Sequence, residues 1–216
     1  MTFAEAQTYV SRSLQDQGTD RLWSTTLIAA LINQGCQDVA RRTGFTKRWV
    51  SFVSDPAEAG GALYVPDLGY TLDEVFHLQT DKGPLLRSTI EELMEADDRW
   101  LEATGGEATD YALGYKLGSV YLYPAPTTPL TTLAGLVTTV YPTHTTDEAV
   151  LQLPPAYHVL PCYFAIAEAY EVDNEASAPQ KADRWRMKYE KGLAEMEAQV
   201  QRAWQRSRPT SPPSYL

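Results

Sequence analysis

Two consecutive helical patterns over residues 153–204 constrain the fold of this chain most strongly. The first begins at Pro154 and Pro155, because the missing N–H of proline would be unpaired in a first helical turn anyway. The second begins at Ser177 with a proline two residues later, a spacing typical of a helix start. Both carry large apolar side chains every three or four residues, so neither helix is stable in water alone. The rest of the chain must cover them.

The apolar stripes of these two helices are continuous. The first helix also contains Pro161, which we expect to kink it. The second helix, which ends at Trp204, would be about 40 Å long at about 1.5 Å per residue. The stripes consist of Val159, Leu160, Tyr163, Phe164, Ala167 and Tyr170 in the first helix and of Trp185, Tyr189, Leu193, Met196, Val200 and Trp204 in the second.

Two amphipathic helices with matching apolar faces are predicted at the start of the chain. One covers residues 2–17, where Thr2 and Glu5 have the spacing of a capping box, and the other covers residues 21–42, capped by Asp20. Gly35 leaves a smooth patch on the second helix, where another helix can approach closely. The simplest packing joins these helices and the C-terminal pair in one bundle.

Between the helices the apolar period changes from 3.6 to 2, which indicates strands. The alternation begins after Gly44, and one helix over residues 88–102, started by Ser88 and Glu91, interrupts it. We therefore predict an α+β fold with three parts. These are a helical bundle of residues 1–44 and 152–204, an inserted antiparallel β lobe of residues 45–151, and an extended C-terminal tail of residues 205–216.

The composition excludes some classes of protein. Of the 216 residues, 44% are hydrophobic, which is ordinary for a globular protein and argues against disorder of the whole chain. The formal net charge of −10 disfavours a free, sequence-specific DNA-binding protein, because such proteins are normally basic. The first residues do not resemble a signal peptide, and no apolar run approaches the ~20 residues of a membrane span. We expect a soluble protein with no membrane partner.

Charged residues are distributed unevenly along the chain. Residues 91–110 contain eight acidic residues and one basic residue, whereas residues 181–208 contain eight basic and four acidic residues. Opposite patches of −7 and +4 suit head-to-tail contacts between copies of the chain, which can close into rings. Alternatively, both patches are ordinary solvated faces. The candidate subunit-interface charges are Glu91, Glu95, Asp98, Arg184, Lys188 and Lys191.

The sequence contains none of the catalytic or phosphate-binding motifs for which we searched. His158 and Cys162 are four residues apart, but no second pair completes a four-ligand metal site. His144 is expected in a polar loop and His77 in a strand, and Cys36 and Cys162 are expected as buried thiols. We therefore predict no catalytic residue, no cofactor and no metal.

Two other functions remain open from the residues alone. A cell-wall polysaccharide hydrolase would need two carboxylates about 5–10 Å apart in a cleft, one of them with a raised pKa. The carboxylates of residues 91–102 instead recur around a helix, as on a solvated face. A carbohydrate- or peptide-binding module would need exposed aromatic side chains on the β lobe. The candidates are Trp49, Tyr64, Tyr70, Tyr115 and Tyr121.

The last twelve residues contain three prolines and no apolar stripe, so they favour an extended conformation over a packed one. This tail is either a frayed terminus or a docking peptide for another protein. The residues that would dock are Arg206, Arg208, Pro209, Pro212, Pro213, Tyr215 and Leu216.

Three segments, taken in order, resemble the head-to-tail adaptor (connector) proteins of tailed bacteriophages, as in short-tailed phages. Residues 31–43 read LINQGCQDVARRT, and residues 117–126 read LGSVYLYPAP before a long strand. Residues 153–157 read LPPAY and lead into a helix rich in alanine and tyrosine. Together these segments span most of the chain.

The resemblance implies a virion structural protein without catalysis, assembled as a ring of twelve subunits in the neck between portal and tail. The C-terminal tail would dock on the portal protein, and a tail or nozzle protein would bind the ring. Packaged DNA would cross the ring without sequence-specific binding, through a channel whose acidic or neutral lining agrees with the net charge of −10. During assembly the protein would be in the host cytoplasm.

Overall fold

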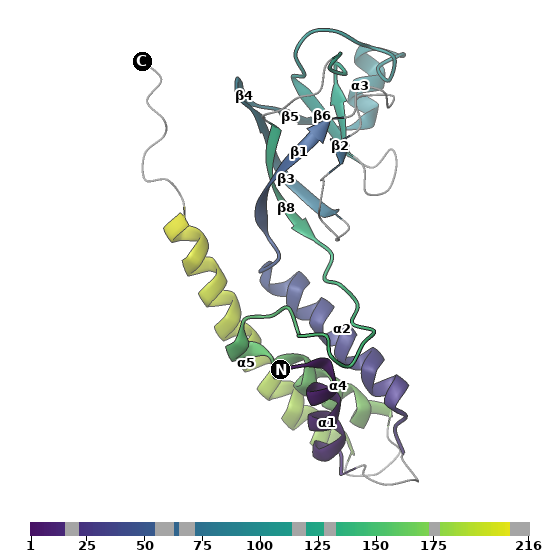
Figure 1. Cartoon of the computed structure of the whole chain (residues 1–216), viewed down its shortest axis with the longest axis vertical. Coiled ribbons are helices and arrows are strands. Elements are labelled where there is room, and N and C mark those ends of the chain that lie inside the picture. The colour runs from purple at the N-terminus through teal and green to yellow at the C-terminus, as the bar shows by residue number, and fades with distance from the viewer. Residues whose placement is uncertain are drawn as a thin grey trace. The chain divides into compact units, whose positions relative to one another are not determined.

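The computed structural model describes residues 1–15, 22–54, 63–64, 72–113, 120–127, 133–172 and 178–207. The chain divides into two compact units. The helical unit consists of Met1–Phe45 and Tyr141–Leu216, and the β unit consists of Thr46–Val140. The predicted α+β class is confirmed, because helices from both ends of the chain pack together and strands occupy the sequence between them (Figure 1).

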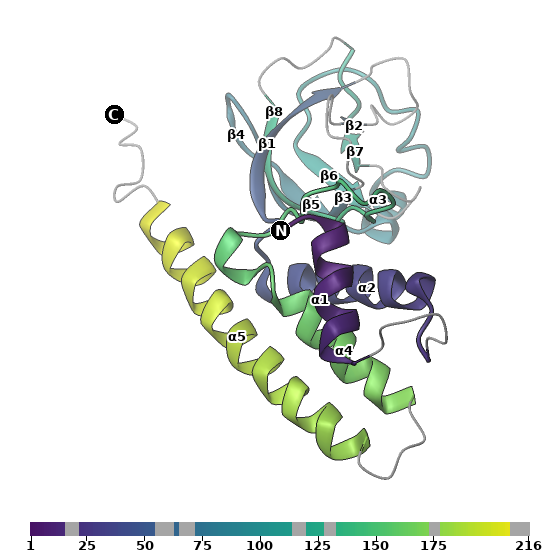
Figure 2. The ribbon, with the colours of Figure 1, turned by 60° about the horizontal axis from the view of Figure 1, so that its bottom comes forward.

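Helix α4 (Leu160–Val172) lies at the centre of the helical unit (Figure 2). It contacts three other helices, α1 (Phe3–Ser13), α2 (Thr25–Thr43) and α5 (Ala178–Ser207). Because α4 has neighbours on several sides, it buries apolar residues on more than one face, and the single stripe predicted for it is too narrow. Its fully buried side chains Cys162, Ala165, Ile166 and Ala169 all lie outside that stripe.

The start of α4 differs from the prediction. Pro155–Tyr157 form a 3₁₀ turn, η1, and the α-helix begins at Leu160. Pro161 is therefore in the first turn of α4, where proline is well tolerated, and the predicted kink within the helix is wrong. Likewise, α2 begins after Ser24, whose side chain accepts a hydrogen bond from Leu27 N–H, and not at residue 21. Asp20 lies outside the described residues.

The close helix approach predicted at Gly35 is confirmed. A Cβ atom at Gly35 would lie 3.0 Å from both Cα and the carbonyl oxygen of Pro161, and 3.1 Å from Phe164 Cβ. These distances are shorter than ordinary carbon contacts, so only glycine allows α2 and α4 to cross here without a shift. The capping box of α1 is also present, because Thr2 and Glu5 exchange side-chain-to-backbone hydrogen bonds.

The loop after residue 140 belongs to the helical unit, although the sequence placed it in the inserted lobe. Tyr141 and Leu151 are almost fully buried in the helical core. The N-terminal residues pair with this loop, because Thr2 forms an antiparallel bridge with Val150 and Phe3 N–H donates to the carbonyl of Ala149. The boundary between the units therefore lies at residue 140, where the last strand has ended.

The described strands of the β unit form one sheet in the order β4-β3-β8-β1-β2-β7-β6-β5. Neighbouring strands are antiparallel, as predicted, except β5 and β6, which are parallel. The strands are β1 (Arg48–Ser54), β2 (Leu63–Tyr64), β3 (Leu72–Thr80), β4 (Gly83–Pro84), β5 (Leu86–Ser88), β6 (Asp110–Leu113), β7 (Val120–Tyr123) and β8 (Leu133–Thr139).

Strands β6 and β7 are covered on both faces. Tyr111 and Leu122 point into the main core of the β unit, whereas their neighbours Ala112 and Tyr121 pack against α3 (Ile90–Ala96). The capping box of α3 pairs Thr89 with Glu92, one residue later than predicted, and the helix ends at Ala96, well before residue 102. Helix α3 is therefore short and covers one face of the sheet at β6 and β7.

Candidate interaction surfaces

One exposed face of α5 carries a basic stripe, which comprises Lys181, Arg184, Lys188 and Lys191. Their spacing of three and four residues places them on the same side of the helix. Lys188 Nζ lies 3.8 Å from the ring centre of Trp185, a cation–π contact that holds the ammonium group against the helix. The three cations predicted at a subunit interface, Arg184, Lys188 and Lys191, thus lie together.

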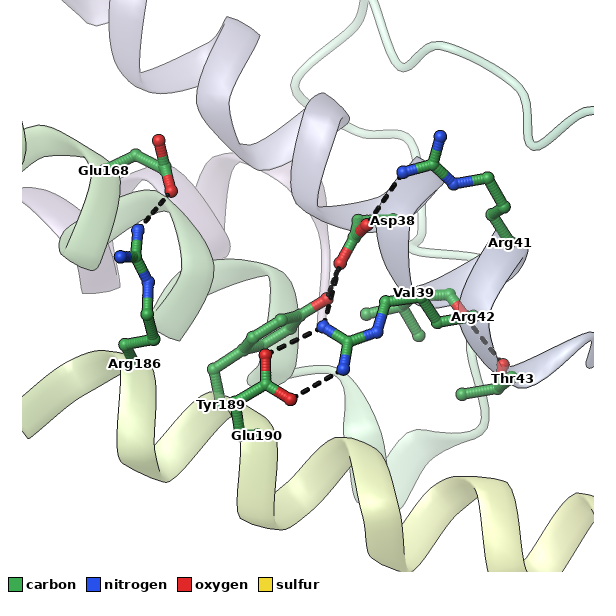
Figure 3. Close-up of polar contacts among 9 residues, drawn as sticks. All are labelled: Asp38, Val39, Arg41, Arg42, Thr43, Glu168, Arg186, Tyr189 and Glu190. Carbon is green, nitrogen blue, oxygen red and sulfur yellow. Dashed lines mark hydrogen bonds and ion pairs between the residues drawn. The ribbon is translucent and has the colours of Figure 1, made fainter. Parts of the chain in front are cut away.

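The other flank of α5 uses its charges within the helical unit (Figure 3). Arg42 of α2 donates to both carboxylate oxygens of Glu190, with distances of 2.7 and 2.6 Å. Arg186 forms ion pairs with Glu168 and Glu171 of α4. These contacts fix α5 against α2 and α4, so these charges are already partnered inside the subunit.

A buried phenol completes this contact between α5 and α2. The O–H group of Tyr189 donates to Asp38 Oδ2 at 2.6 Å, while Arg42 lies 3.7 Å from the same oxygen (Figure 3). Burial, followed by the nearby Asp38 carboxylate, raises the pKa of Tyr189, which therefore stays a protonated donor. The hydrogen bonds from Arg42 lower the pKa of Glu190, so this pair is charged at neutral pH.

The acidic candidates lie on the β unit. Glu91 and Glu95 are one helical turn apart on α3, and Asp98 follows the end of the helix. All three are exposed, and within the described part of the chain none forms an ion pair. Met94, between them, is 55% exposed, so the patch combines negative charge with apolar surface. Other acidic residues of this region have local roles, for example Glu107, which pairs with Lys82.

Two grooves share Tyr157, Gln199 and Ala203 along the C-terminal half of α5. The larger, about 710 Å³, is bordered by charged residues such as Lys191, Glu195 and Arg202. The smaller, about 370 Å³, is here called the aromatic groove. It is lined by Phe45, Pro154, Tyr157, Met196, Gln199, Val200, Ala203 and Trp204. The sequence analysis missed both grooves, because Phe45 and Tyr157 approach α5 only through the tertiary fold.

The proposed docking tail is only partly described. Arg206 lies in the last turn of α5, which continues to Ser207, so the helix extends beyond the predicted start of the tail at residue 205. The other candidate docking residues, Arg208, Pro209, Pro212, Pro213, Tyr215 and Leu216, lie outside the described residues. Figures 1 and 2 show the C-terminal turns of α5 extending away from α4.

The histidines of the helical unit have structural partners. His144 lies in a loop, as predicted, but its side chain is buried: its backbone N–H donates to Asn33 Oδ1 at 2.8 Å, and its carbonyl accepts from Asn33 Nδ2 at 3.0 Å. Burial lowers the pKa of His144, so its ring is neutral at pH 7. His158 is also buried, with Nε2 2.7 Å from the carbonyl oxygen of Leu153.

The cysteines offer no reactive thiolate. Cys36 and Cys162 are fully buried free thiols. Burial raises the pKa of each thiol to about 12, which leaves both protonated. Among the described residues, no cluster of histidine, cysteine and carboxylate side chains is arranged to hold a metal ion.

Of the five aromatic residues considered for a binding module, the structure describes the side chains of two, and these two do not form an exposed platform. Trp49 is half-exposed and packs edge-on against His77, whereas Tyr121 is buried beside Trp100. The side chains of Tyr64, Tyr70 and Tyr115 lie outside the described set. Tyr121 therefore cannot contribute to an exposed ligand surface.

The comparisons with known proteins identify a family. Within the described residues, no helix has the length and apolar character needed to cross a membrane. A comparison with curated proteins found no match. The family described as SU10 adaptor protein, by contrast, matches residues 1–213, which is nearly the whole chain. The chain therefore belongs to the SU10 adaptor protein family, a family of phage head-to-tail adaptors.

Proposed function

We propose that this chain is a virion structural protein that forms a ring between the portal and the tail of a phage and lines the DNA exit channel. The family match over residues 1–213 is the observation that carries the proposal. An adaptor needs surfaces for its own copies and for the proteins on either side. It needs no catalytic centre.

The charge distribution supports contacts between subunits. The basic stripe of α5 and the acidic patch of Glu91, Glu95 and Asp98 lie on different units of the chain. A head-to-tail contact that brings the stripe of one copy to the patch of the next would bring opposite charges together. Such a contact mainly sets orientation, because exposed ion pairs contribute little free energy each.

The net charge supports the proposed channel. DNA that crosses a ring must not be retained, and every lysine or arginine that contacts a phosphate adds salt-dependent affinity. A subunit with a net charge of −10 disfavours such retention. We propose twelve copies in the ring, with a tail or nozzle protein bound to its free face.

Reconstitution with the portal protein of the same phage tests this function. Portal rings are mixed with the full chain or with a variant that ends at Ser207, and the products are separated by sedimentation. The full chain should co-sediment with the portal in a fixed ratio, and the shortened chain should bind more weakly. A full chain that never co-sediments with the portal would contradict the proposal.

A further inference from the structure

The aromatic groove beside α5 has the chemistry of a site for an extended, proline-rich peptide. Phe45, Tyr157 and Trp204 supply three aromatic side chains, and Pro154, Met196 and Val200 complete an apolar lining. Proline-rich segments in the polyproline II conformation bind in aromatic-lined grooves, because they are extended before binding and lose little entropy. With a volume of about 370 Å³, the groove has room for several side chains.

The groove also has a polar group suited to an extended peptide. Tyr157 O–H donates to Gln199 Oε1 at 2.7 Å, which fixes the amide of Gln199 at the rim. The side-chain nitrogen of Gln199 has no hydrogen-bond acceptor among the described residues, so it can donate to a peptide carbonyl. A polyproline II helix has no internal hydrogen bonds, so its carbonyl groups need such donors.

The chain itself contains a matching peptide directly after α5. Residues 208–216 read RPTSPPSYL, in which Pro209 and Pro212 have the P-x-x-P spacing of polyproline II ligands. Tyr215 and Leu216 add apolar side chains at the end. The peptide starts one residue after Ser207, and Trp204 of the groove lies within the last turn of the same helix.

The length of this segment fits a fold-back along α5. From Trp204 to Met196 the groove covers eight residues of helix, or about 12 Å at about 1.5 Å per residue. Nine tail residues at about 3.1 Å each span about 28 Å, which leaves enough chain for the reversal of direction. The covalent link gives the tail a high effective concentration at the groove of its own chain.

We propose that the aromatic groove binds residues 208–216 of its own chain in the free subunit. The occupied groove buries Trp204 and Tyr157 before assembly, and any partner that takes the tail must first displace it. The inference does not depend on the adaptor role, because both the groove and the peptide belong to a single chain.

A spin label on the tail tests this proposal. Ser214→Cys introduces a third thiol, while Cys36 and Cys162 are buried and protonated, so a nitroxide reagent should modify position 214 selectively. In the ¹⁵N-labelled full chain, the amide signals of Tyr157, Val200 and Ala203 should lose intensity and recover when the nitroxide is reduced. Signals from α1 should keep theirs. If the groove signals had equal intensities with the nitroxide oxidised and reduced, the proposal would be overturned.

Two matched substitutions locate the contact. Ala203→Glu places a charge in the aromatic groove and should abolish the signal loss, whereas Ala194→Glu, on the same helix but outside that groove, should not. Both alanines are exposed, so the fold should tolerate the changes. Replacement of Pro212 and Pro213 by serine removes two of the three prolines of the tail and should also reduce the loss. Signal loss that survives both Ala203→Glu and these serine variants would contradict the proposal.

A mixing experiment distinguishes the same chain from a second copy. Spin-labelled chain without ¹⁵N is mixed with ¹⁵N-labelled chain that carries no spin label. Binding within one chain predicts that the groove signals of the ¹⁵N-labelled chain are unchanged. Their loss in the mixture would show a tail exchanged between copies and would overturn the assignment.

Discussion

At Gly35 the absence of one side chain sets the distance between α2 and α4. Gly35→Ala would place a methyl group 3.0 Å from the backbone of Pro161, which cannot move without displacing α4. Overpacking costs about 1–3 kcal/mol, while the better helix propensity of alanine returns up to about 1 kcal/mol. We expect a net decrease in the free energy of unfolding, measured by urea denaturation of the purified variant.

Gln34→Ala is the matched control, because Gln34 is exposed on the same helix. It should change the free energy of unfolding by less than about 0.5 kcal/mol. If Gly35→Ala were as stable as this control, the close packing of α2 on α4 would be contradicted.

His144 makes the helical unit sensitive to acid. Its pKa in the folded protein is lowered by burial, whereas the unfolded chain has the ordinary value near 6.5. Between these two values the unfolded state binds more protons, so the free energy of unfolding decreases as the pH falls below about 6.5. We expect urea midpoints to fall from pH 7 to pH 5 and His144→Gln to reduce this slope. An identical slope in the variant would exclude His144 as the cause.

At the scale of elements, the contact of α5 with α2 combines a buried and an exposed interaction. Tyr189→Phe removes a donor from a hydrogen bond to the partly buried Asp38 and should cost about 1.5–3 kcal/mol. Arg42→Gln breaks a pair of about half-exposed side chains and should cost less than about 1 kcal/mol. Urea denaturation of both variants compares them, and a larger loss for Arg42→Gln would contradict this ranking.

Local signals in the sequence predicted most elements but not their limits. The spacing of Thr2 and Glu5 predicted the start of α1 correctly, because a cap depends only on neighbouring residues. At α3, Ser88 and Thr89 both offer a cap with a glutamate three residues later, and only the fold selects Thr89. The spacing of apolar residues in α4 gave the wrong buried face for a different reason, because a helix with neighbours on several sides has no single apolar face.

The sequence predicts one of the two interaction surfaces on α5 and not the other. The basic stripe on α5 was predictable, because helical spacing alone brings Arg184, Lys188 and Lys191 to one face. The aromatic groove was not, because Phe45 lies more than a hundred residues before Trp204 in the chain. Asn33 was part of the family resemblance, but its bonds to the backbone of His144 needed coordinates to be seen.

In the whole molecule, the helical unit carries the basic stripe and the β unit carries the acidic patch. We propose that the stripe of one copy contacts the patch of the next. Charge reversal of Arg184 and Lys191 to glutamate should weaken ring assembly on the portal, most clearly at low salt where screening is weak. Reversal of Glu91 and Glu95 to lysine in the same chain should restore assembly. The occupancy of the ring, measured by mass photometry, reports both effects.

Arg12→Glu is the control for this pair of reversals, since Arg12 is exposed on α1 and outside both patches. It should leave ring occupancy unchanged. If the chain with both the basic and the acidic residues reversed assembled no better than the chain with only the basic residues reversed, the two patches would not face each other.

Native mass spectrometry measures directly whether this chain adds to a portal as a defined ring. The purified chain is measured alone and after mixing with portal rings of the same phage. We expect the portal to gain the mass of a fixed number of copies, twelve for the proposed ring, whether the free chain is a monomer or an oligomer. A portal whose mass never changes, in a mixture where the chain remains folded and free, would exclude the adaptor role.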